Sequence, residues 1–471
     1  MNFETCKNKG IIAVKEAYEK AQNVQKALNA VVTFADVDAQ LEKLKNVDTK
    51  APLYGMPVVL KDNVSTKGIR TTASSRILDN YVPFFNAHIV DKLEAAGAVV
   101  IAKSSMDELG MGGTNLNAYT GKVNNPWDLS RISGGSSGGS AALVAAGVVP
   151  FAIGSDTGDS VRKPASYCGV IGVKPTYGRI SRYGVVPYAS SLDHVGYFTT
   201  NVKDAAVVLE VLAGRDDRDM TTSYKEVEAY ASLLDANVQG KKIAILKNVQ
   251  DVIENDEISS SFNHIMSKLK EKGAIVEEIE MNPTLLNALL PTYYVISNAE
   301  ATANHANLDG VRFGVREDGE NLEEIMTNSR TKGFSSLVRK RFVLGSYSLF
   351  EENQEKIFRK AQKVRRLIVD ELKSKLAEYD CIVATAAGVA PLPEDSLGDR
   401  LSASGLILEN HMVLGNFSGY PSMTLPATFV EGMPVGINIM CKPFEEKEMF
   451  NIASAIEEIT GFKNRCVEVN E

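Results

Sequence analysis

Two motifs rich in serine and glycine constrain this chain more than any other feature of its sequence. The first, S-G-G-S-S-G-G-S, covers Ser133–Ser140, and the second, G-S-D-T-G-D-S-V-R, covers Gly154–Arg162. A glycine and serine run is often a flexible linker, but a linker between Pro126 and the following run of alanines and valines would split one apolar core. The glycines instead allow close backbone approach, and the loop leads into a helix N-terminus. The motifs therefore predict a folded site.

A lysine upstream supplies the base that such a site needs. Lys61 follows the apolar run Val58–Leu60 in the segment G-M-P-V-V-L-K-D-N. A serine hydroxyl is a weak nucleophile until a base takes its proton, and burial is what keeps a lysine neutral enough to be that base. A surface lysine paired with Asp62 would be the usual interpretation without the serine motifs. With them, we predict that Lys61 is a buried catalytic base.

The composition argues against metal, nucleic-acid and membrane proteins. The chain has 59 acidic and 51 basic residues and a net charge of −8, whereas binding nucleic acid by bulk charge needs a basic face. The five cysteines and five histidines are scattered, which favours neither a metal site nor a disulfide framework. No run of about 18 apolar residues and no secretory signal is present. We expect a cytoplasmic protein with no membrane contact and no metal.

Alternating helix and strand patterns predict an α/β fold. We predict two helices in 11–47 and a mostly helical region at about 284–379, which contains one long helix at 350–375. Further helices are predicted at 88–96, 140–146, 258–272 and 447–460, and strands at 57–60, 98–102, 148–153, 241–246, 275–279, 381–384, 422–426 and 435–440. The length alone leaves open one large domain or two sub-cores.

The three motifs resemble the amidase signature family, closely over residues 51–223 and more loosely over 291–462. The resemblance implies a single amidase domain over residues 1–471, with N-terminal helices at about 1–47 and substrate-side helices at about 284–379. It also implies the amidase signature fold, a central mixed β-sheet covered by helices on both faces.

The resemblance further assigns a Ser–Ser–Lys triad. Ser160 matches the nucleophile, Ser136 the serine that relays its proton, and Lys61 the final base. The Gly135–Ser136 peptide bond is expected to be cis.

The oxyanion site departs from the family pattern. The resemblance places it on the backbone N–H groups around Thr157, Gly158 and Asp159, but the family usually has glycine at 159. Aspartate is one of the few other residues that tolerate a positive φ. Its carboxylate would oppose a developing negative charge unless a cation held it. Lys163, which replaces the usual glutamine, and Arg162 are the candidates.

Two further segments resemble one branch of the family, the glutaminase A subunits of aspartyl/glutamyl-tRNA amidotransferases. They are K-P-T-Y-G-R-I-S-R-Y-G-V-V-P-Y-A-S-S-L-D-H-V-G (174–196) and A-G-R-D-D-R-D (213–219). Such a glutaminase hydrolyses glutamine through a glutamyl-serine intermediate. It passes ammonia to a tRNA-binding kinase/transamidase partner, the B subunit, which amidates Glu-tRNA(Gln) or Asp-tRNA(Asn). A small bridging partner, the C subunit, would join the two. No cofactor is expected in this chain, and ATP and Mg²⁺ are expected at the B subunit, which would also hold the mischarged tRNA.

The same resemblance points to the glutamine-binding residues. Tyr293, Tyr294 and Arg341 fall in segments that resemble the substrate side, and a guanidinium forks well onto an α-carboxylate. Glu409 matches the position of a family aspartate. Arg339 and Arg312 are the alternatives to Arg341 if that residue is structural.

Three functions remain open at this point. The first is the amidotransferase glutaminase, the second is a stand-alone amidase of the same fold, and the third is a scaffold that has lost catalysis through Asp159. The sequence does not decide between the two tRNA substrates.

Overall fold

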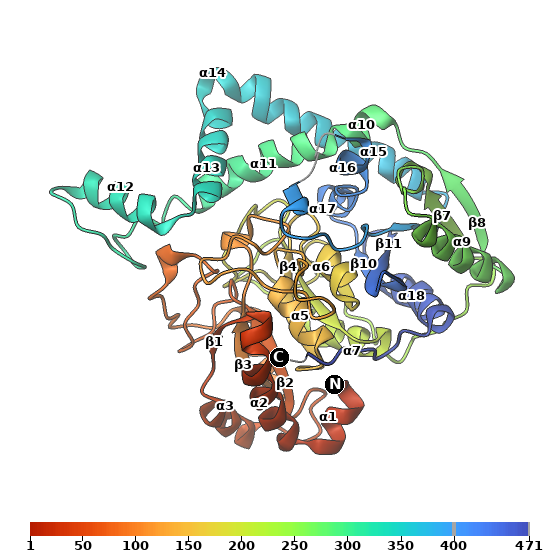
Figure 1. The fold of residues 1–471 in the computed structure, drawn as a ribbon, viewed down its shortest axis with the longest axis horizontal. Helices are drawn as coiled ribbons and strands as arrows, with labels where there is room; N and C mark the ends of the chain where they lie inside the picture. The colour runs from red at the N-terminus through yellow and green to blue at the C-terminus, as the bar shows by residue number, and fades with distance from the viewer. Residues whose placement is uncertain (398–401, 470–471) are drawn as a thin grey trace.

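Eleven strands form one mixed β-sheet within the described residues 1–397 and 402–469 of the computed structural model (Figure 1). Their order is β1-β3-β2-β4-β6-β5-β10-β11-β9-β7-β8. The strands are β1 (Val31–Phe34), β2 (Met56–Lys61), β3 (Ala98–Ser104), β4 (Phe151–Asp156), β5 (Ile171–Lys174), β6 (His194–Thr199), β7 (Lys242–Leu246), β8 (Ile275–Ile279), β9 (Cys381–Thr385), β10 (Ser422–Val430) and β11 (Met433–Cys441).

The functional motifs lie at one edge of this sheet. Strand β2 lies between β3 and β4 and runs parallel to both. Lys61 is the last residue of β2, and Asp156 is the last residue of β4. Because the carboxyl ends of parallel strands meet at the same edge, Lys61 lies beside the turn that carries Ser160.

Helices account for most of the remaining structure. They are α1 (Phe3–Lys9), α2 (Ile11–Leu28), α3 (Val37–Lys43), α4 (His88–Ala95), α5 (Gly138–Ala145), α6 (Arg162–Cys168), α7 (Val202–Leu212), α8 (Lys247–Gln250), α9 (Asp256–Glu271), α10 (Pro283–Asn287), α11 (Leu289–Asn304), α12 (Leu322–Gly333), α13 (Ser336–Leu349), α14 (Glu351–Gln354), α15 (Lys360–Leu376), α16 (Ala403–Ile407), α17 (Val413–Ser418) and α18 (Glu446–Thr460).

Both faces of the sheet are covered, as β2 shows. Side chains alternate across a strand. Val58 and Leu60 belong to an apolar cluster that includes buried residues of α4, α7 and α18. Val59 belongs to a second cluster, which includes buried residues of α2 and α5. This arrangement confirms the predicted α/β fold with helices on both faces of a mixed sheet.

The region 284–379 is mostly helical, as predicted, and α12 projects from the body of the molecule (Figure 1). The predicted long helix at 350–375 is present as α14 and α15, joined by a π-helical turn at Glu355–Arg359. Whether the chain folds as the single domain expected above stays a prediction.

The two helices predicted in residues 11–47 are present as α2 and α3, but the prediction missed the strand β1 between them. Helix α2 ends at Asn29, which adopts the left-handed conformation. Strand β1 then pairs antiparallel with β3, and α3 follows. The edge of the sheet offers unpaired backbone groups to this short β-branched segment. Pairing with them outweighs the helical tendency of the flanking residues.

Strands β5 and β6 were also missing from the prediction. Each has only four to six residues and is buried along its whole length, so neither shows the alternation that marks a half-buried strand. Among the described residues, no helix has both the length and the apolar content that a membrane span requires.

Candidate active site

Lys61 and Ser136 meet at the centre of the site. Lys61 Nζ lies 2.7 Å from Ser136 Oγ, and both side chains are buried. The apolar strand β2 carries the lysine beneath the glycine-rich loop, so the predicted base and the predicted relay are in direct contact. Their catalytic roles remain predictions.

Two further serines orient the lysine amine. Lys61 Nζ lies 2.8 Å from Ser137 Oγ and 2.9 Å from Ser155 Oγ. The Ser137 hydroxyl donates to the Ser155 carbonyl oxygen, and the Asn63 amide donates to Ser155 Oγ. The Ser137 hydroxyl is thereby committed as a donor and its oxygen accepts from the amine, whereas Ser155 Oγ accepts from Asn63 and keeps its own proton. In neutral Lys61, one N–H group therefore points to Ser137, and the nitrogen lies within hydrogen-bond distance of Ser136.

Burial lowers the pKa of Lys61 to about 7, although Asp107, Asp156 and Asp193 act in the opposite direction. An ordinary lysine is almost wholly protonated at neutral pH. The neutral Lys61 amine, which can take a proton from Ser136, is therefore accessible near neutral pH.

Asp107 packs against the glycine-rich loop and fixes its position. The Gly135–Ser136 peptide bond is cis, as the resemblance implied. The Asp107 N–H donates to the Ser136 carbonyl oxygen at 3.2 Å. A Cβ on Gly135 would lie 1.9 Å from Asp107 Oδ2, and a Cβ on Gly112 would lie 2.1 Å from Asp107 Cγ. Only glycines therefore leave room for this carboxylate under the loop.

The turn that carries Ser160 offers a row of free N–H groups. Among the described residues, the backbone N–H groups of Thr157 to Ser160 make no hydrogen bond. Ser137 N–H donates to the Ser160 carbonyl oxygen at 3.1 Å, so the two motifs are in contact. The Ser160 hydroxyl makes no hydrogen bond within the described residues, to Ser136 or otherwise. Unpaired amides beside a serine are the arrangement that stabilises an oxyanion.

Lys163 holds the unexpected carboxylate of Asp159. Their charged atoms are 2.7 Å apart, and Lys163 also lies 3.1 Å from the Glu409 carboxylate. Although burial opposes its charge, Asp159 and Glu409 together raise the pKa of Lys163. Asp159 is not among the residues with positive φ, so the turn does not use the torsional tolerance of aspartate.

Arg162, the other candidate cation, is engaged elsewhere. It lies 2.8 Å from the Asp156 carboxylate and donates to the Gly158 carbonyl oxygen at 2.8 Å. Arg162 thus holds the turn through the Gly158 carbonyl oxygen, which points opposite to the Asp159 N–H group of the same trans peptide.

The substrate-side residues converge from the helical region. Arg341 Nη1 donates to the Tyr188 hydroxyl at 2.7 Å, and its guanidinium lies over the Tyr294 ring. A Cβ on Gly158 would lie 3.1 Å from the Tyr293 ring. Tyr293 therefore borders the Ser160 turn, whereas Arg341 and Tyr294 lie together, with Arg341 bonded to Tyr188. Arg312, in contrast, is exposed and pairs with Asp309.

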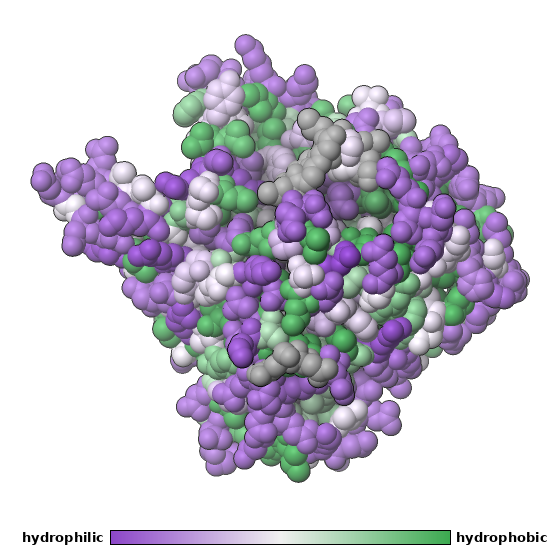
Figure 2. All heavy atoms as spheres, viewed as in Figure 1, coloured by the Kyte–Doolittle hydropathy of each residue, from purple (hydrophilic) through white to green (hydrophobic). Residues whose placement is uncertain are grey.

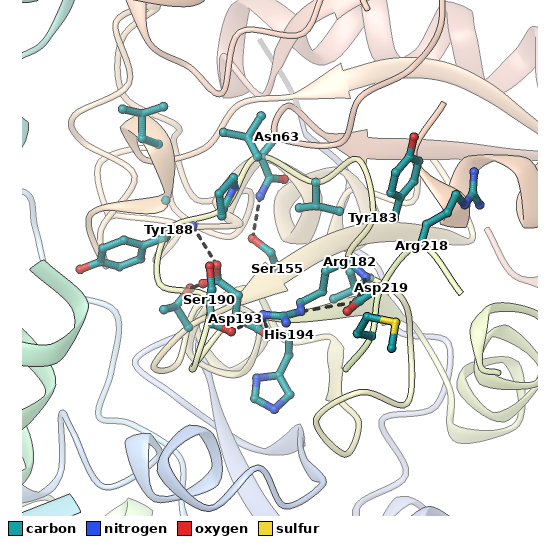
Figure 3. A pocket seen from close by; sticks show the side chains of 18 residues that line it. Asn63, Ser155, Arg182, Tyr183, Tyr188, Ser190, Asp193, His194, Arg218 and Asp219 are labelled. Atoms are coloured by element: carbon teal, nitrogen blue, oxygen red, sulfur yellow. Dashed lines mark hydrogen bonds and ion pairs between the residues drawn. The ribbon is translucent and has the colours of Figure 1, made fainter. Parts of the chain in front are cut away.

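A cavity of about 260 Å³ opens on the lysine side of the site. Figure 3 shows Asn63 and Ser155 joined at its wall, with Asp193 and His194 nearby. Asn63 Oδ1 and His194 Nε2 have no hydrogen-bond partner within the described residues. His194 Nδ1 lies 2.7 Å from the Leu192 carbonyl oxygen, so Nδ1 carries the proton and Nε2 is an acceptor. Both acceptors are buried beside the cavity wall.

Sequence reasoning missed Ser137, Ser155, Asp107 and Tyr188. Ser137 and Ser155 lie inside the two motifs, but a pattern of serines does not tell which hydroxyls touch the lysine. Asp107 and Tyr188 come from loops between elements. In the part of the chain that the structure describes, no three His, Cys, Asp or Glu side chains are grouped so that they could hold a metal ion.

The model of the amidase family matches residues 13–450. A curated relative from Geobacillus thermodenitrificans, named as the A subunit of glutamyl-tRNA(Gln) amidotransferase, is 40% identical over 459 residues, which cover 95% of this chain and 93% of the relative. A protein of the same name from Lactobacillus delbrueckii is 39% identical, with 98% and 95% covered.

Two solved structures have a similar fold over nearly the whole chain. The A subunit of glutamyl-tRNA(Gln) amidotransferase from Thermotoga maritima superposes with a TM-score of 0.82 at 34% identity, covering 100% of this chain and 98% of that one. The peptide amidase of Stenotrophomonas maltophilia gives a TM-score of 0.81 at 25% identity, with 96% and 93% covered.

Proposed function

Because the chain belongs to the amidase family, we propose that it is the glutamine-hydrolysing subunit of a glutamyl-tRNA(Gln) amidotransferase. The likeness to A subunits over nearly the whole chain supports this function. The observation that carries the chemistry is the buried Lys61, 2.7 Å from Ser136 and with a pKa lowered to about 7.

The reaction begins with proton removal. Ser136 gives its proton to neutral Lys61 and takes the proton of Ser160, whose oxygen attacks the side-chain carbonyl carbon of glutamine. The carbonyl electrons move to the oxygen, and the N–H groups around Thr157 to Asp159 stabilise that charge. The proton then returns through Ser136 to the leaving nitrogen, and ammonia departs. Water, activated by the same relay, cleaves the glutamyl ester of Ser160 and releases glutamate.

Recognition of glutamine uses the two charged groups of its backbone. Arg341 binds the α-carboxylate, and Tyr293 and Tyr294 flank the side chain. Glu409 is the candidate for the α-ammonium group. It acts within a cluster of two carboxylates, Asp159 and Glu409, that share one cation, Lys163. The cluster keeps one negative charge in excess, which suits an ammonium group.

The cavity beside Lys61 receives the ammonia. Ser155 and Thr157 on its wall adjoin the reacting centre, because Ser155 Oγ lies 2.9 Å from Lys61 Nζ. Its opposite wall includes Arg218 and the exposed Met220. Ammonia can therefore leave on a side away from the arginine that binds glutamine.

The partners complete the reaction. The tRNA-binding B subunit holds the mischarged tRNA and takes up ATP and Mg²⁺, and the small C subunit joins it to this chain. The acidic balance of this chain, with a net charge of −8, supports leaving tRNA binding to a partner. The isolated chain should therefore bind tRNA weakly in a filter or polarisation assay. A tight, salt-sensitive complex of this chain alone with tRNA would contradict that division of labour.

A stand-alone amidase is the second candidate, because peptide amidase shares the fold at a TM-score of 0.81. One experiment separates the candidates. Glutamine hydrolysis is measured for the chain alone and with the B and C subunits plus Glu-tRNA(Gln). The proposed function predicts formation of Gln-tRNA(Gln) that requires this chain. Turnover of small amides that partners and tRNA leave unchanged would favour the stand-alone enzyme.

A further inference from the structure

The outer face of α13 is apolar and uncovered. Its buried residues include Val338, Phe342 and Gly345, which face the body of the molecule. On the opposite side, Val343 and Leu344 are 68% and 59% exposed. Leu337, Tyr347 and Phe350 are also exposed and continue this stripe at helical spacing. We call these five exposed apolar residues the α13 face.

A groove extends the α13 face toward α12. It has a volume of about 710 Å³, and its apolar lining comes from Leu322, Met326, Phe334, Phe342 and Val343. Val343 belongs to both the groove and the α13 face, so the two surfaces are continuous. Figure 1 shows α12 standing away from the body, and in Figure 2 hydrophobic residues gather over the end of α13 near α14. Contiguous apolar surface of this kind usually marks an interaction site.

The middle of this surface is basic, whereas the exposed Glu351 and Glu352 lie at its Phe350 end. Between Ser335 and Phe350 there is no acidic residue, whereas Arg339 and Lys340 are exposed. Neither forms an ion pair within the described residues. The groove adds Arg330 and one acidic residue, Glu323. The chain in total has more acidic than basic residues, 59 against 51. The part of the surface around Arg339 and Lys340 therefore complements a ligand that is apolar and carries carboxylates there.

We infer that the α13 face and the adjoining groove bind an amphipathic helix of a partner protein, with carboxylates along the rim of its apolar side. This inference rests on the proposed function, which requires a partner. A helix is the expected occupant because a groove between two helices accepts side chains at spacings of three and four residues. Arg339 and Lys340 would pair with the rim carboxylates.

The side of α13 that faces the body of the molecule contributes to the proposed glutamine site. Arg341 extends from α13 to the Tyr188 hydroxyl, 2.7 Å away. Gly345 packs so closely on α11 that a Cβ would lie 2.1 Å from the Asn298 carbonyl oxygen. Helix α11 also carries Tyr293. A partner bound to the α13 face therefore restrains both Arg341 and Tyr293, and it should lower KM for glutamine.

The test replaces two side chains of the α13 face that take no part in the active site. Val343→Asp with Tyr347→Asp should weaken binding of the purified B and C subunits by about a hundredfold, because central apolar residues dominate such interfaces. Glutamine hydrolysis by the isolated chain should stay within about twofold of wild type. Ile12→Asp on α2 is the matched control, since Ile12 is 62% exposed, and it should leave binding unchanged.

A charge reversal tests the second half of the inference. Arg339→Glu with Lys340→Glu should weaken binding by about tenfold and reduce its dependence on salt. The fall in KM for glutamine that the partners cause in wild type should be lost in the Val343→Asp, Tyr347→Asp variant.

The outcomes are distinguishable. Equal partner binding by wild type and the α13-face variants would overturn the docking surface alone. Self-association of wild type that the variants abolish, measured by light scattering, would mean that a second copy covers the face. A wild-type chain that hydrolyses small amides but binds neither of the two partners would overturn the amidotransferase function together with the docking surface.

Discussion

The two sides of the candidate active site are built in different ways. On the lysine side, Lys61, Ser136, Ser137 and Ser155 are held within three sequence motifs at one edge of the sheet, and all are buried or nearly so. On the carboxylate side, Lys163 joins Asp159 to Glu409, 250 residues further along the chain and 38% exposed at its side chain. The lysine side is closed and built on the ends of neighbouring strands and the loops after them, whereas the carboxylate side joins an i,i+4 pair to the distant Glu409 and is partly open.

This difference separates chemistry from recognition. Proton transfer needs fixed distances, which a buried cluster on strand ends provides. Recognition needs charge of the right sign, which several side chains can supply. The carboxylate side can therefore accept Asp159 and Lys163 in place of the usual glycine and glutamine, provided that the two changes occur together. The lysine side has no such freedom.

Changes on the lysine side should have the largest effect. Ser160→Ala should abolish glutamine hydrolysis, and Ser136→Ala and Lys61→Ala should each lower kcat by about 10⁴-fold or more, because a triad acts as a unit. Ser140→Ala is the control within the same motif, since its hydroxyl contacts Ser104 and Ile153 rather than Lys61. Turnover of Lys61→Ala near the wild-type rate would remove the assignment of the base.

Arg341→Ala should have the next largest effect on glutamine hydrolysis. Loss of a charge-assisted contact to the α-carboxylate should raise KM for glutamine by about a hundredfold and change kcat little. A small primary amide that lacks the carboxylate should be hydrolysed almost as before. Arg312→Ala, on an exposed arginine of the same region, is the control. Equal losses on glutamine and on the small amide would instead mean a structural role for Arg341.

The smallest effects are expected for the exchanged pair on the carboxylate side. Lys163→Gln should lower kcat/KM by about ten- to hundredfold, because it leaves Asp159 unpaired near the developing oxyanion. Asp159→Gly should change it by less than about tenfold, since the backbone N–H is retained. The Asp159→Gly, Lys163→Gln double variant should recover most of the kcat/KM that Lys163→Gln loses. Strictly additive effects in this cycle would show that the two positions do not couple.

The same contrast explains what could be predicted from the sequence. Lys61, Ser136 and Ser160 lie in short motifs whose chemistry is local, so residue type and order were enough to single them out. Lys163 as the cation for Asp159 was predictable because four residues separate them on one helix turn. The contact between Lys163 and Glu409 was not, because it depends on how α6 packs against the segment before α17.

The fold shows a similar limit. Strands with clear flanking turns, such as β7 and β8, were predicted within one residue. Strand β1 was missed because its four residues are stabilised only by pairing with β3. Tyr188 was missed as a contact of Arg341 because its position depends on a loop that meets α13 only in the folded chain.

The pH dependence of kcat/KM for glutamine tests the central claim, a neutral buried Lys61 as the base, most directly. Only the deprotonated amine can accept a proton from Ser136, and the pKa of Lys61 is lowered to about 7. The rate constant should therefore reach a plateau above about pH 8 and fall about tenfold for each unit below pH 7. A profile that is flat from about pH 5.5 to 9, or one that rises only near pH 10, would contradict the account.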